Sequence, residues 1–330
     1  MIERRTLAED LIEWWQSAQR NLPWREDRTA YPVLVSEFML QQTRIESVLP
    51  YFHRWMICFP SLQNLAVADE SEVMAAWQGL GYYSRARNLH SCAKWICENG
   101  WPAEKEEWRK LPGIGDYTAS ALSAALLGAD EVAVDGNLAR VYARLQTVES
   151  TGEPLRRAAK HWLSEQREGV DADTWNQMLM DFGATVCKPT GPLCGTCAVQ
   201  SQCIARKLNA VSRYPTRPAK AKRRTIHGEI YLLKRDDTVG LHKIEDGKWW
   251  RGLWVLPFHL HEELASGEAL ASPVLGQVRA TVTKHLLLLD VIVPEEDHFS
   301  WGEPERWVPL SEVHTVAMPA PFRKVLKQFA

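Results

Sequence analysis

The stretch LPGIGDYTASALSAALLG, residues 111–128, contains a Pro-Gly-Ile-Gly turn that is followed directly by a helical run. Glycine lets the backbone approach a ligand closely, and the free N–H groups at the start of a helix attract an anion such as a phosphate. The same spacing also occurs in ordinary tight turns between two helices. The stretch therefore predicts two helices joined by a tight turn, with Gly113 and Gly115 as candidates for a phosphate contact.

The residues on either side of this turn indicate a helical region, which is followed by a region of strands. Between residues 6 and 183 apolar residues recur at spacings of three and four, with Pro and Gly between the runs. Beyond residue 228 short β-like runs dominate. We therefore predict an all-α domain at 1–204 and a smaller α+β domain at 225–330. The stretch between them, 205–224, has eight Lys or Arg and no acid, which predicts a basic linker.

The overall composition favours a soluble protein with two domains. The 330 residues exceed the usual length of one domain, and 45% of them are apolar, which is enough for a core. The N-terminus lacks the pattern of a signal peptide, and no run of about 18 apolar residues occurs. We expect a soluble, intracellular protein with no membrane partner and, by default, a monomer. The net charge of −2 gives no global positive field, so a nucleic-acid contact must come from local patches.

Four of the seven cysteines lie within residues 187–203, at the spacing C-x6-C-x2-C-x5-C. Disulfides rarely persist in a reducing compartment, so a metal centre is the better interpretation. Four thiolates hold either tetrahedral zinc or a cubane iron–sulfur cluster. Structural zinc favours two C-x2-C pairs, and only one is present, which favours a [4Fe–4S] cluster with a structural role as the default. The candidate ligands are Cys187, Cys194, Cys197 and Cys203.

Two acids stand in apolar surroundings in the helical region. Asp135, in VAVDGNLARVYARL, takes the position of an N-cap before an amphipathic helix. Glu37, in VSEFMLQQT, is flanked by apolar residues and shares a helical face with Gln41. Burial raises the pKa of a carboxyl group, which can then donate a proton near neutrality. If the two acids meet, they form a candidate active site; capping alone for Asp135 and a surface position for Glu37 remain the alternatives.

Several of these motifs together resemble a known superfamily of DNA repair enzymes. LPGIGDYTA, in the segment 111–120, resembles the helix-hairpin-helix of the endonuclease III superfamily of DNA glycosylases; VDGN resembles its catalytic aspartate motif, and the cysteine spacing resembles its iron–sulfur loop. Within that superfamily LPWR at 22–25, SEFMLQQT at 36–43 and GLGYYSRARNLH at 79–90 resemble the MutY-type adenine DNA glycosylases. The resemblance covers essentially the whole chain and is strongest over residues 20–205. Motifs in the same order make coincidence improbable, although each one alone is weak.

The resemblance implies a monofunctional base excision repair enzyme that acts on duplex DNA. Members of this family remove adenine mispaired with 8-oxoguanine or guanine after flipping it out of the helix. Glu37 would protonate N7 of the adenine, and Asp135 would stabilise the oxocarbenium-like sugar as an anion, so the two acids would need opposite pKa tuning. Asn137 and Tyr117 would organise Asp135 and the sugar. Bifunctional relatives have a lysine at the position of Tyr117, and a phenol cannot form an imine with the sugar.

The resemblance also implies which side chains contact the DNA. Three of them would surround the adenine: Trp24, Arg25 and Gln177. Four would enter or contact the helix near the oxidised guanine: Gln42, Thr43, Leu80 and Tyr82. The product would be an abasic site, and the expected location is the cytoplasm of a bacterial-type cell, in association with the nucleoid.

The C-terminal region resembles the Nudix-like domain with which the family recognises 8-oxoguanine. The acid-rich Nudix box is missing from the sequence, so this domain is expected to bind and not to hydrolyse. The family's recognition loop is typically Phe-Ser-His or Leu-Thr-His. An ungapped comparison places Val282, Thr283 and Lys284 there, with His285 one residue late. Either a one-residue shift restores His285 to the loop, or Lys284 takes the place of the histidine. The plainer alternative is that His285 is a surface residue beside a strand. In that case the preference for 8-oxoguanine over guanine would be weaker.

Two other functions remain as alternatives. An endonuclease III-like lyase on oxidised pyrimidines is disfavoured by Tyr117, and only an imine would be trapped by borohydride. A non-catalytic protein that scans for lesions and recruits repair proteins through the basic linker would need neither acid, so Glu37→Gln would leave it intact. A Nudix hydrolase is disfavoured by the missing metal-binding glutamates.

Overall fold

The computed structural model describes residues 5–216, 224–246, 249–261, 274–294 and 301–330. The chain separates into two compact units. The first comprises Met1–Gln42, Ser61–Gln63 and Ser91–Lys220, and the second comprises Thr43–Pro60, Asn64–His90 and Ala221–Ala330. Within the described residues no helix combines the length and apolar character that crossing a bilayer requires.

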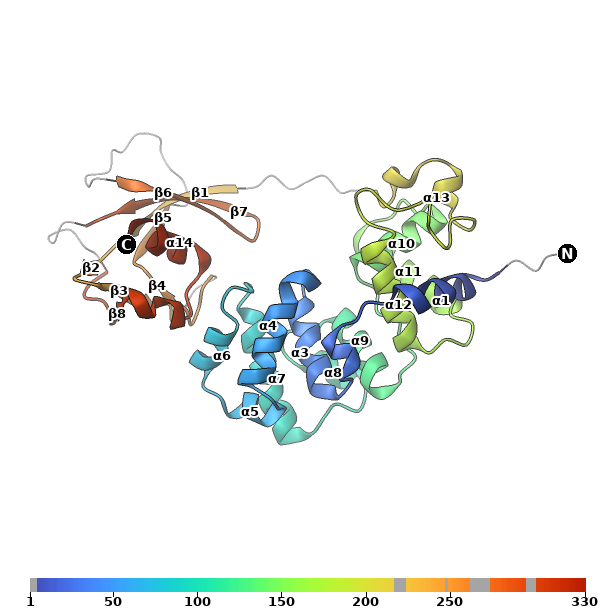
Figure 1. Ribbon diagram of the computed structural model, residues 1–330, viewed down its shortest axis with the longest axis horizontal. Helices are drawn as coiled ribbons and strands as arrows, with labels where there is room; N and C mark the ends of the chain where they lie inside the picture. The colour runs from blue at the N-terminus through green and yellow to red at the C-terminus, as the bar shows by residue number, and fades with distance from the viewer. Residues whose placement is uncertain (1–4, 217–223, 247–248, 262–273, 295–300) are drawn as a thin grey trace. The chain divides into compact units, whose positions relative to one another are not determined.

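The helical region predicted from the sequence is present, and Figure 1 shows its helices in blue to yellow. Its described elements are α1 (Leu7–Ala18), α2 (Pro23–Glu26), α3 (Ala30–Leu40), α4 (Ile45–Cys58), α5 (Leu62–Val67), α6 (Glu70–Ala76), α7 (Ser84–Asn99), α8 (Lys105–Lys110), α9 (Asp116–Leu127), α10 (Gly136–Gln146), α11 (Gly152–Glu165), α12 (Ala172–Thr185), α13 (Ile204–Lys207) and the 3₁₀ helix η1 (Val211–Arg213).

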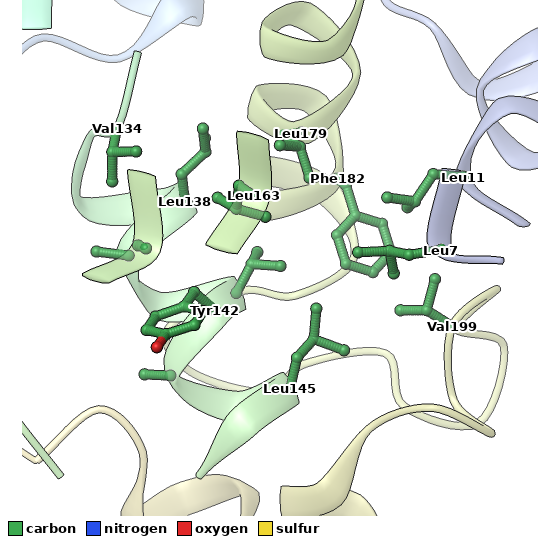
Figure 2. Packing of buried hydrophobic residues seen from close by; sticks show 14 of the residues in the cluster. Leu7, Leu11, Val134, Leu138, Tyr142, Leu145, Leu163, Leu179, Phe182 and Val199 are labelled. Carbon is green, nitrogen blue, oxygen red and sulfur yellow. The ribbon is translucent and has the colours of Figure 1, made fainter. Parts of the chain in front are cut away.

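The core of the first unit is built around α10 and α12. Figure 2 shows Phe182 and Leu179 of α12 among the side chains of Leu138 and Leu145 of α10, with Leu11 of α1 nearby. Each fully buried leucine or phenylalanine stabilises the fold by about 1.5–3 kcal/mol relative to an exposed one. This packing fixes α10, whose N-terminus carries Asp135, against α12.

The tight turn predicted at residues 111–115 joins α8 to α9. Leu111 and Ile114 are buried and anchor the turn from inside, and the Ile114 amide donates to the Leu111 carbonyl at 3.2 Å. Gly113 has a φ of 77°, a conformation that glycine adopts without strain, and Gly115 caps α9 in an extended conformation. The two helices and their turn therefore form the expected hairpin.

One predicted helical stretch is broken in the structure. The apolar pattern from residue 37 to 56 predicts continuous helix, but α3 ends at Leu40 and α4 begins at Ile45. Gln42 between them has a φ of 58°, in the left-handed region. The break turns the chain at Gln41 and Gln42, and it takes both residues out of a regular helical face.

The helical packing extends further along the chain than the predicted boundary at residue 204. Ala205, Ala210 and Tyr214 are buried in the same core as α10 and α12. Arg206 and Lys207, which suggested a solvated linker, belong to the short helix α13. Residues 205–214 are therefore packed chain, and residues 217–223 of the predicted linker lie outside the described residues.

The C-terminal region contains the expected strands and a closing helix. Its described elements are β1 (Arg224–Tyr231), β2 (Lys234–Arg235), β3 (Thr238–Lys243), β4 (Trp254–Val255), β5 (Phe258–His261), β6 (Val274–Val282), β7 (His285–Ile292), β8 (Arg306–Pro309), the 3₁₀ helix η2 (Leu310–Thr315) and α14 (Ala320–Phe329). One sheet has the order β5-β1-β7-β6, and in the other β3 lies between β2 and β4 and also pairs with β8. β1 and β7 are parallel, while β6 and β7 form an antiparallel hairpin.

Candidate active site

Glu37 and Asp135, which are far apart in the sequence, line one cavity of about 500 Å³ in the first unit. Its walls come from the end of α3, the break that follows it, the hairpin between α8 and α9, and the start of α10. The lining residues are Glu37, Leu40, Gln41, Gln42, Gly113, Gly115, Tyr117, Thr118, Asp135 and Gly136. The cavity therefore brings together the two acids, the tyrosine and both hairpin glycines that the sequence singled out.

Glu37 is a carboxyl group with an unusually high proton affinity. It lies on α3 between buried neighbours such as Ser36 and Phe38. Burial is the largest cause that raises its pKa, to about 7, and the nearby charges of Asp173 and Asp135 raise it further. A carboxyl group with this pKa keeps its proton in about half of the molecules at neutral pH, so it can act as a general acid there.

Asp135 is the N-cap of α10, as the sequence predicts. Its Oδ1 accepts hydrogen bonds from the amides of Asn137 at 2.7 Å and Leu138 at 2.8 Å. Its Oδ2 accepts from the side-chain amide of Asn137 at 2.8 Å. The two backbone amides would otherwise be unsatisfied at the helix start, and the three bonds together fix the orientation of the carboxylate.

The opposite pKa tuning expected for the two acids is not what the structure has, because burial raises the pKa of Asp135 as well as that of Glu37. For Asp135 the hydrogen bonds from Leu138 and Asn137 and the charge of Arg140 act in the other direction. These interactions favour the ionised form of Asp135. Burial is the largest of these causes, so the net shift of the Asp135 pKa is upward.

Tyr117, near the start of α9, lies at the wall of the cavity. Burial and the nearby carboxyl groups of Glu37 and Asp135 raise its pKa well above 10, so the phenol stays protonated. Its hydroxyl group donates to the sulfur of Met180 at 3.7 Å. Tyr117 thus brings a neutral, fixed hydroxyl group to the cavity wall.

Gln41 joins the break after α3 to the hairpin. Its side-chain nitrogen donates to the carbonyl of Gly113 at 3.1 Å and to the hydroxyl of Thr118 at 3.4 Å. This contact orients the turn at Gly113 relative to Glu37, which lies four residues before Gln41, in the last turn of α3. Gln41 is therefore bonded to the hairpin, and Gln42 is exposed at the rim.

Two of the three residues predicted to surround the adenine, Arg25 and Gln177 of α12, are joined by a hydrogen bond away from this cavity. Arg25 donates through Nε to Oε1 of Gln177 at 2.8 Å and through both Nη atoms to Asp181 at 2.7 and 2.9 Å. Trp24 is buried. None of these side chains lines the 500 Å³ cavity within the described residues. In this conformation Arg25 positions Gln177 and does not itself offer a free charge.

Asp181 is a functional candidate that the sequence analysis missed. It is fully buried, and it accepts from the indole of Trp15 and from Arg20 as well as from Arg25. These contacts lower its pKa despite its burial, so it stays ionised. In the sequence, Asp181 could be noticed only because it follows Gln177 by four residues on a largely apolar helix. An acid exposed to the solvent would show the same spacing.

Two buried arginines of α10 connect the aspartate to the cysteine loop. Arg140 donates to the side-chain oxygen of Asn137 at 2.9 Å, to the carbonyl of Gly183 at 2.8 Å and to the carbonyl of Cys187 at 2.9 Å. Arg144 donates to the carbonyl of Lys188 at 2.7 Å and lies 3.4 Å from the sulfur of Cys187. Arg140 and Arg144 lie four residues apart on one face of α10. This face therefore holds both the Asn137 side chain, which bonds Asp135, and the backbone of the cysteine loop.

The four clustered cysteines line one small cavity between α10, α12 and the loop that follows. Burial raises the pKa of the Cys197 thiol to about 11, so a thiolate there requires a positive charge nearby. Within the described residues, no three His, Cys, Asp or Glu side chains converge as the ligands of one ion do.

The residues predicted to contact the opposite strand lie in the second unit, apart from Gln42. Thr43 is half-buried and Leu80 is buried, with 8% of its surface exposed. Tyr82 is 48% exposed. Between α6 and α7, Tyr82, and not Leu80, is therefore the large side chain that is exposed to the solvent.

The predicted recognition loop is the tip of the hairpin between β6 and β7. Thr283 and Lys284 form the two-residue connection and are exposed, with a φ of 53° at Thr283. His285 is the first residue of β7; it is 8% exposed and packs on Trp249, with 5.2 Å between the ring centroids. The plainer alternative of a surface histidine is thus wrong, because β7 turns its first side chain inward.

Comparisons with known proteins agree with this geometry. The model of the HhH-GPD superfamily of base excision DNA repair proteins matches residues 35–165. The adenine DNA glycosylase of Arabidopsis thaliana is 35% identical over 301 residues, covering 77% of this chain and 48% of that protein. The human adenine DNA glycosylase is 40% identical over 211 residues, covering 60% and 39%. The one from Buchnera aphidicola of Schizaphis graminum is 27% identical and covers 97% of each chain.

Solved structures confirm the fold of the helical part. A thermostable thymine-DNA glycosylase superposes with a TM-score of 0.54 at 23% identity, over 61% of this chain and 95% of that one. An endonuclease III in a non-covalent complex with DNA has a TM-score of 0.53 at 20% identity, over 61% and 94%. This chain spans less than half the length of the Arabidopsis and human relatives. Residues 35–165 thus match the helix-hairpin-helix superfamily of base excision DNA repair proteins, and the chain is similar to adenine DNA glycosylases over 77% of its length in the Arabidopsis comparison and 97% in the Buchnera comparison.

Proposed function

We propose that this chain is a monofunctional DNA glycosylase that hydrolyses the N-glycosidic bond of adenine mispaired with 8-oxoguanine or guanine in duplex DNA. The observation that carries the proposal is the shared cavity of Glu37 and Asp135 beside the hairpin. The names of the relatives support the adenine substrate, and the complex of endonuclease III with DNA supports the duplex. The hairpin glycines at the cavity rim would contact a DNA phosphate.

The two acids divide the chemistry between them. Adenine leaves poorly as an anion, so a proton delivered to N7 by Glu37 makes it a neutral leaving group. As the bond lengthens, positive charge develops on the sugar, and the oriented carboxylate of Asp135 stabilises it. A water molecule then adds to the sugar and leaves an abasic site. The cavity of about 500 Å³ is of the size of a small-molecule pocket, which suits a flipped base.

The test of this proposal is a single-turnover assay on duplexes that carry adenine opposite 8-oxoguanine, guanine or cytosine. We expect adenine release at the first two pairs and strand cleavage only after alkali, because Tyr117 cannot form an imine. Treatment with borohydride should trap no covalent complex. The rate ratio between 8-oxoguanine and guanine measures lesion preference.

Each alternative has its own outcome in that assay. Strand cleavage without alkali, or a borohydride-trapped complex, would replace the proposal by an endonuclease III-like lyase. Binding of the duplex with no release of any base by metal-loaded protein would leave a lesion-scanning protein.

We further propose that Cys187, Cys194, Cys197 and Cys203 hold a [4Fe–4S] cluster. The cavity that all four line and the buried Arg144 beside Cys187 support it. When bound, such a cluster supplies a rigid centre around which the loop folds. Arg144 would offset the negative charge of the thiolates, and its bond to the Lys188 carbonyl would hold the loop in shape.

Replacing Cys197 by serine should remove the cluster. We expect purified wild-type protein to contain iron and acid-labile sulfide in equal amounts and Cys197→Ser to lose both, because one thiolate ligand is missing. The matched control is Cys97→Ser, at an exposed cysteine of α7, which should keep its iron. Zinc in place of iron in anaerobically purified wild-type protein would overturn the choice of cluster.

The C-terminal region would read the base opposite the adenine. We propose that it is Nudix-like and that the exposed hairpin tip of Thr283 and Lys284 contacts the lesion. His285, which packs on Trp249, would support this tip from the start of β7. Lys284 would then replace the histidine of the family's loop. We also propose that repair proteins bind the basic residues around 205–224. The protein would be a monomer, and it would be located in the cytoplasm in association with the nucleoid.

A further inference from the structure

The turn between α6 and α7 holds an aromatic residue in an unfavourable backbone conformation. Gly79 and Gly81 have φ values of 99° and 77°, which glycine tolerates, but Tyr82 has a φ of 48°. A residue with a Cβ atom rarely adopts this left-handed region, so the surroundings must hold it there. The Tyr82 side chain is 48% exposed, and its own burial therefore does not supply the restraint.

Arg85 supplies the contacts that hold this turn. Its Nη2 donates to the carbonyls of Leu80 at 3.3 Å and Gly81 at 3.2 Å. Its guanidinium carbon lies 5.5 Å from the centroid of the Tyr82 ring and 5.4 Å from that of Trp77, within the range of cation–π attraction. The Trp77 indole in turn donates to the Gly81 carbonyl at 3.0 Å. One planar cation thus binds the backbone of the turn and the ring that the turn presents.

The burial of this cation is itself informative. Only 6% of the Arg85 surface is exposed, and burial lowers its pKa to about 10, so it remains charged at neutral pH. Burying a charge is unfavourable unless it is compensated by hydrogen bonds, and Nη2 of Arg85 makes two such bonds to carbonyls of the turn. Arginine suits this place better than lysine because its planar group can both donate to two carbonyls and lie near two rings.

We propose that Arg85 is a positioning residue that fixes the Tyr82 ring in the orientation in which it meets DNA. This inference rests on the proposed function, because it assumes that the chain binds a mispaired duplex. An exposed aromatic ring on a rigid turn can stack on a base, or fill the space that a flipped base leaves. A turn that is already in its bound conformation loses less entropy on binding.

A double-mutant cycle tests the proposal. The probe is a duplex with 2′-fluoro-2′-deoxyadenosine opposite 8-oxoguanine, because the fluorine prevents base release and leaves binding to be measured. We expect Arg85→Met to raise the Kd about tenfold, through loss of the restraint on Tyr82. We expect the double variant Tyr82→Ala with Arg85→Met to bind no more weakly than Tyr82→Ala alone. Arg85→Lys should restore part of the affinity.

The control is Arg235→Met, which removes an arginine that lies over Trp307 elsewhere in the second unit and should leave the Kd unchanged. Additive effects in the cycle, or an unchanged Kd in Arg85→Met, would overturn the positioning role. If thermal unfolding shows that Arg85→Met does not fold, the cycle with Arg85→Lys decides by the same criterion. Failure of the wild-type protein to bind the duplex would instead overturn the proposed function.

Discussion

Replacing Glu37 by glutamine lowers the rate of adenine release by about 10²–10⁴-fold, the usual contribution of a general acid, while the duplex is still bound. Glutamine keeps the size and the hydrogen-bonding ability of the side chain, but it carries no acidic proton. The measurement is single-turnover release from the duplex with 8-oxoguanine, together with the Kd for the 2′-fluoro probe. Glu98→Gln, at an exposed glutamate of α7, is the control and should match the wild type. Full activity in Glu37→Gln would remove Glu37 from the chemistry.

The pH dependence follows from the same side chain. Since burial raises the pKa of Glu37 to about 7, the protonated fraction falls above that pH, and the rate of release should fall about tenfold for each further pH unit.

The free energy of unfolding should also decrease as the pH rises, for the same reason. The pKa in the folded protein lies above the ordinary value of 4.5, so the stability that protonated Glu37 preserves is complete below pH 4.5 and is lost as the pH rises through 7. Glu37→Gln should therefore unfold at a higher temperature than the wild type at pH 8.

Asp135→Asn should lower base release by about 10²–10³-fold or more, because the negative charge that faces the developing oxocarbenium ion is removed. Asparagine is as good an N-cap as aspartate, so the amides of Asn137 and Leu138 remain bonded and α10 keeps its start. The matched control is Asp171→Asn at the N-cap of α12, where the side chain accepts from the Thr174 amide at 2.9 Å. Loss of activity in both variants, or in neither, would contradict a special role for Asp135.

The local features of the site were predictable from the sequence because they depend on neighbouring residues. The Pro-Gly-Ile-Gly turn at 112–115 and the N-cap at Asp135 are confirmed, since a turn and a helix start are encoded within a few positions. The meeting of Glu37 with Asp135 was left open by the sequence. It depends on how α3 packs beside α9, and no local pattern records that.

Other features were hidden because buried charges resemble surface charges in a sequence. Arg140 and Arg85 each follow helical spacing and look solvated, yet both are buried and bonded to backbone carbonyls. The break at Gln42 lacks the glycine that usually marks a left-handed residue. The basic composition of residues 205–214 concealed the apolar contacts of Ala205 and Tyr214.

The contact between α10 and α12 sets a narrow tolerance for the catalytic carboxylate. A Cβ atom built on Gly183 would lie 2.8 Å from the Cβ of Asn137, closer than carbon atoms approach each other. The same glycine offers its carbonyl to Arg140, which also holds the Asn137 side chain. Because Gly183 has no side chain, α10 can approach α12 this closely at Asn137. The position of Asp135 therefore depends on a glycine of α12 that does not itself line the cavity.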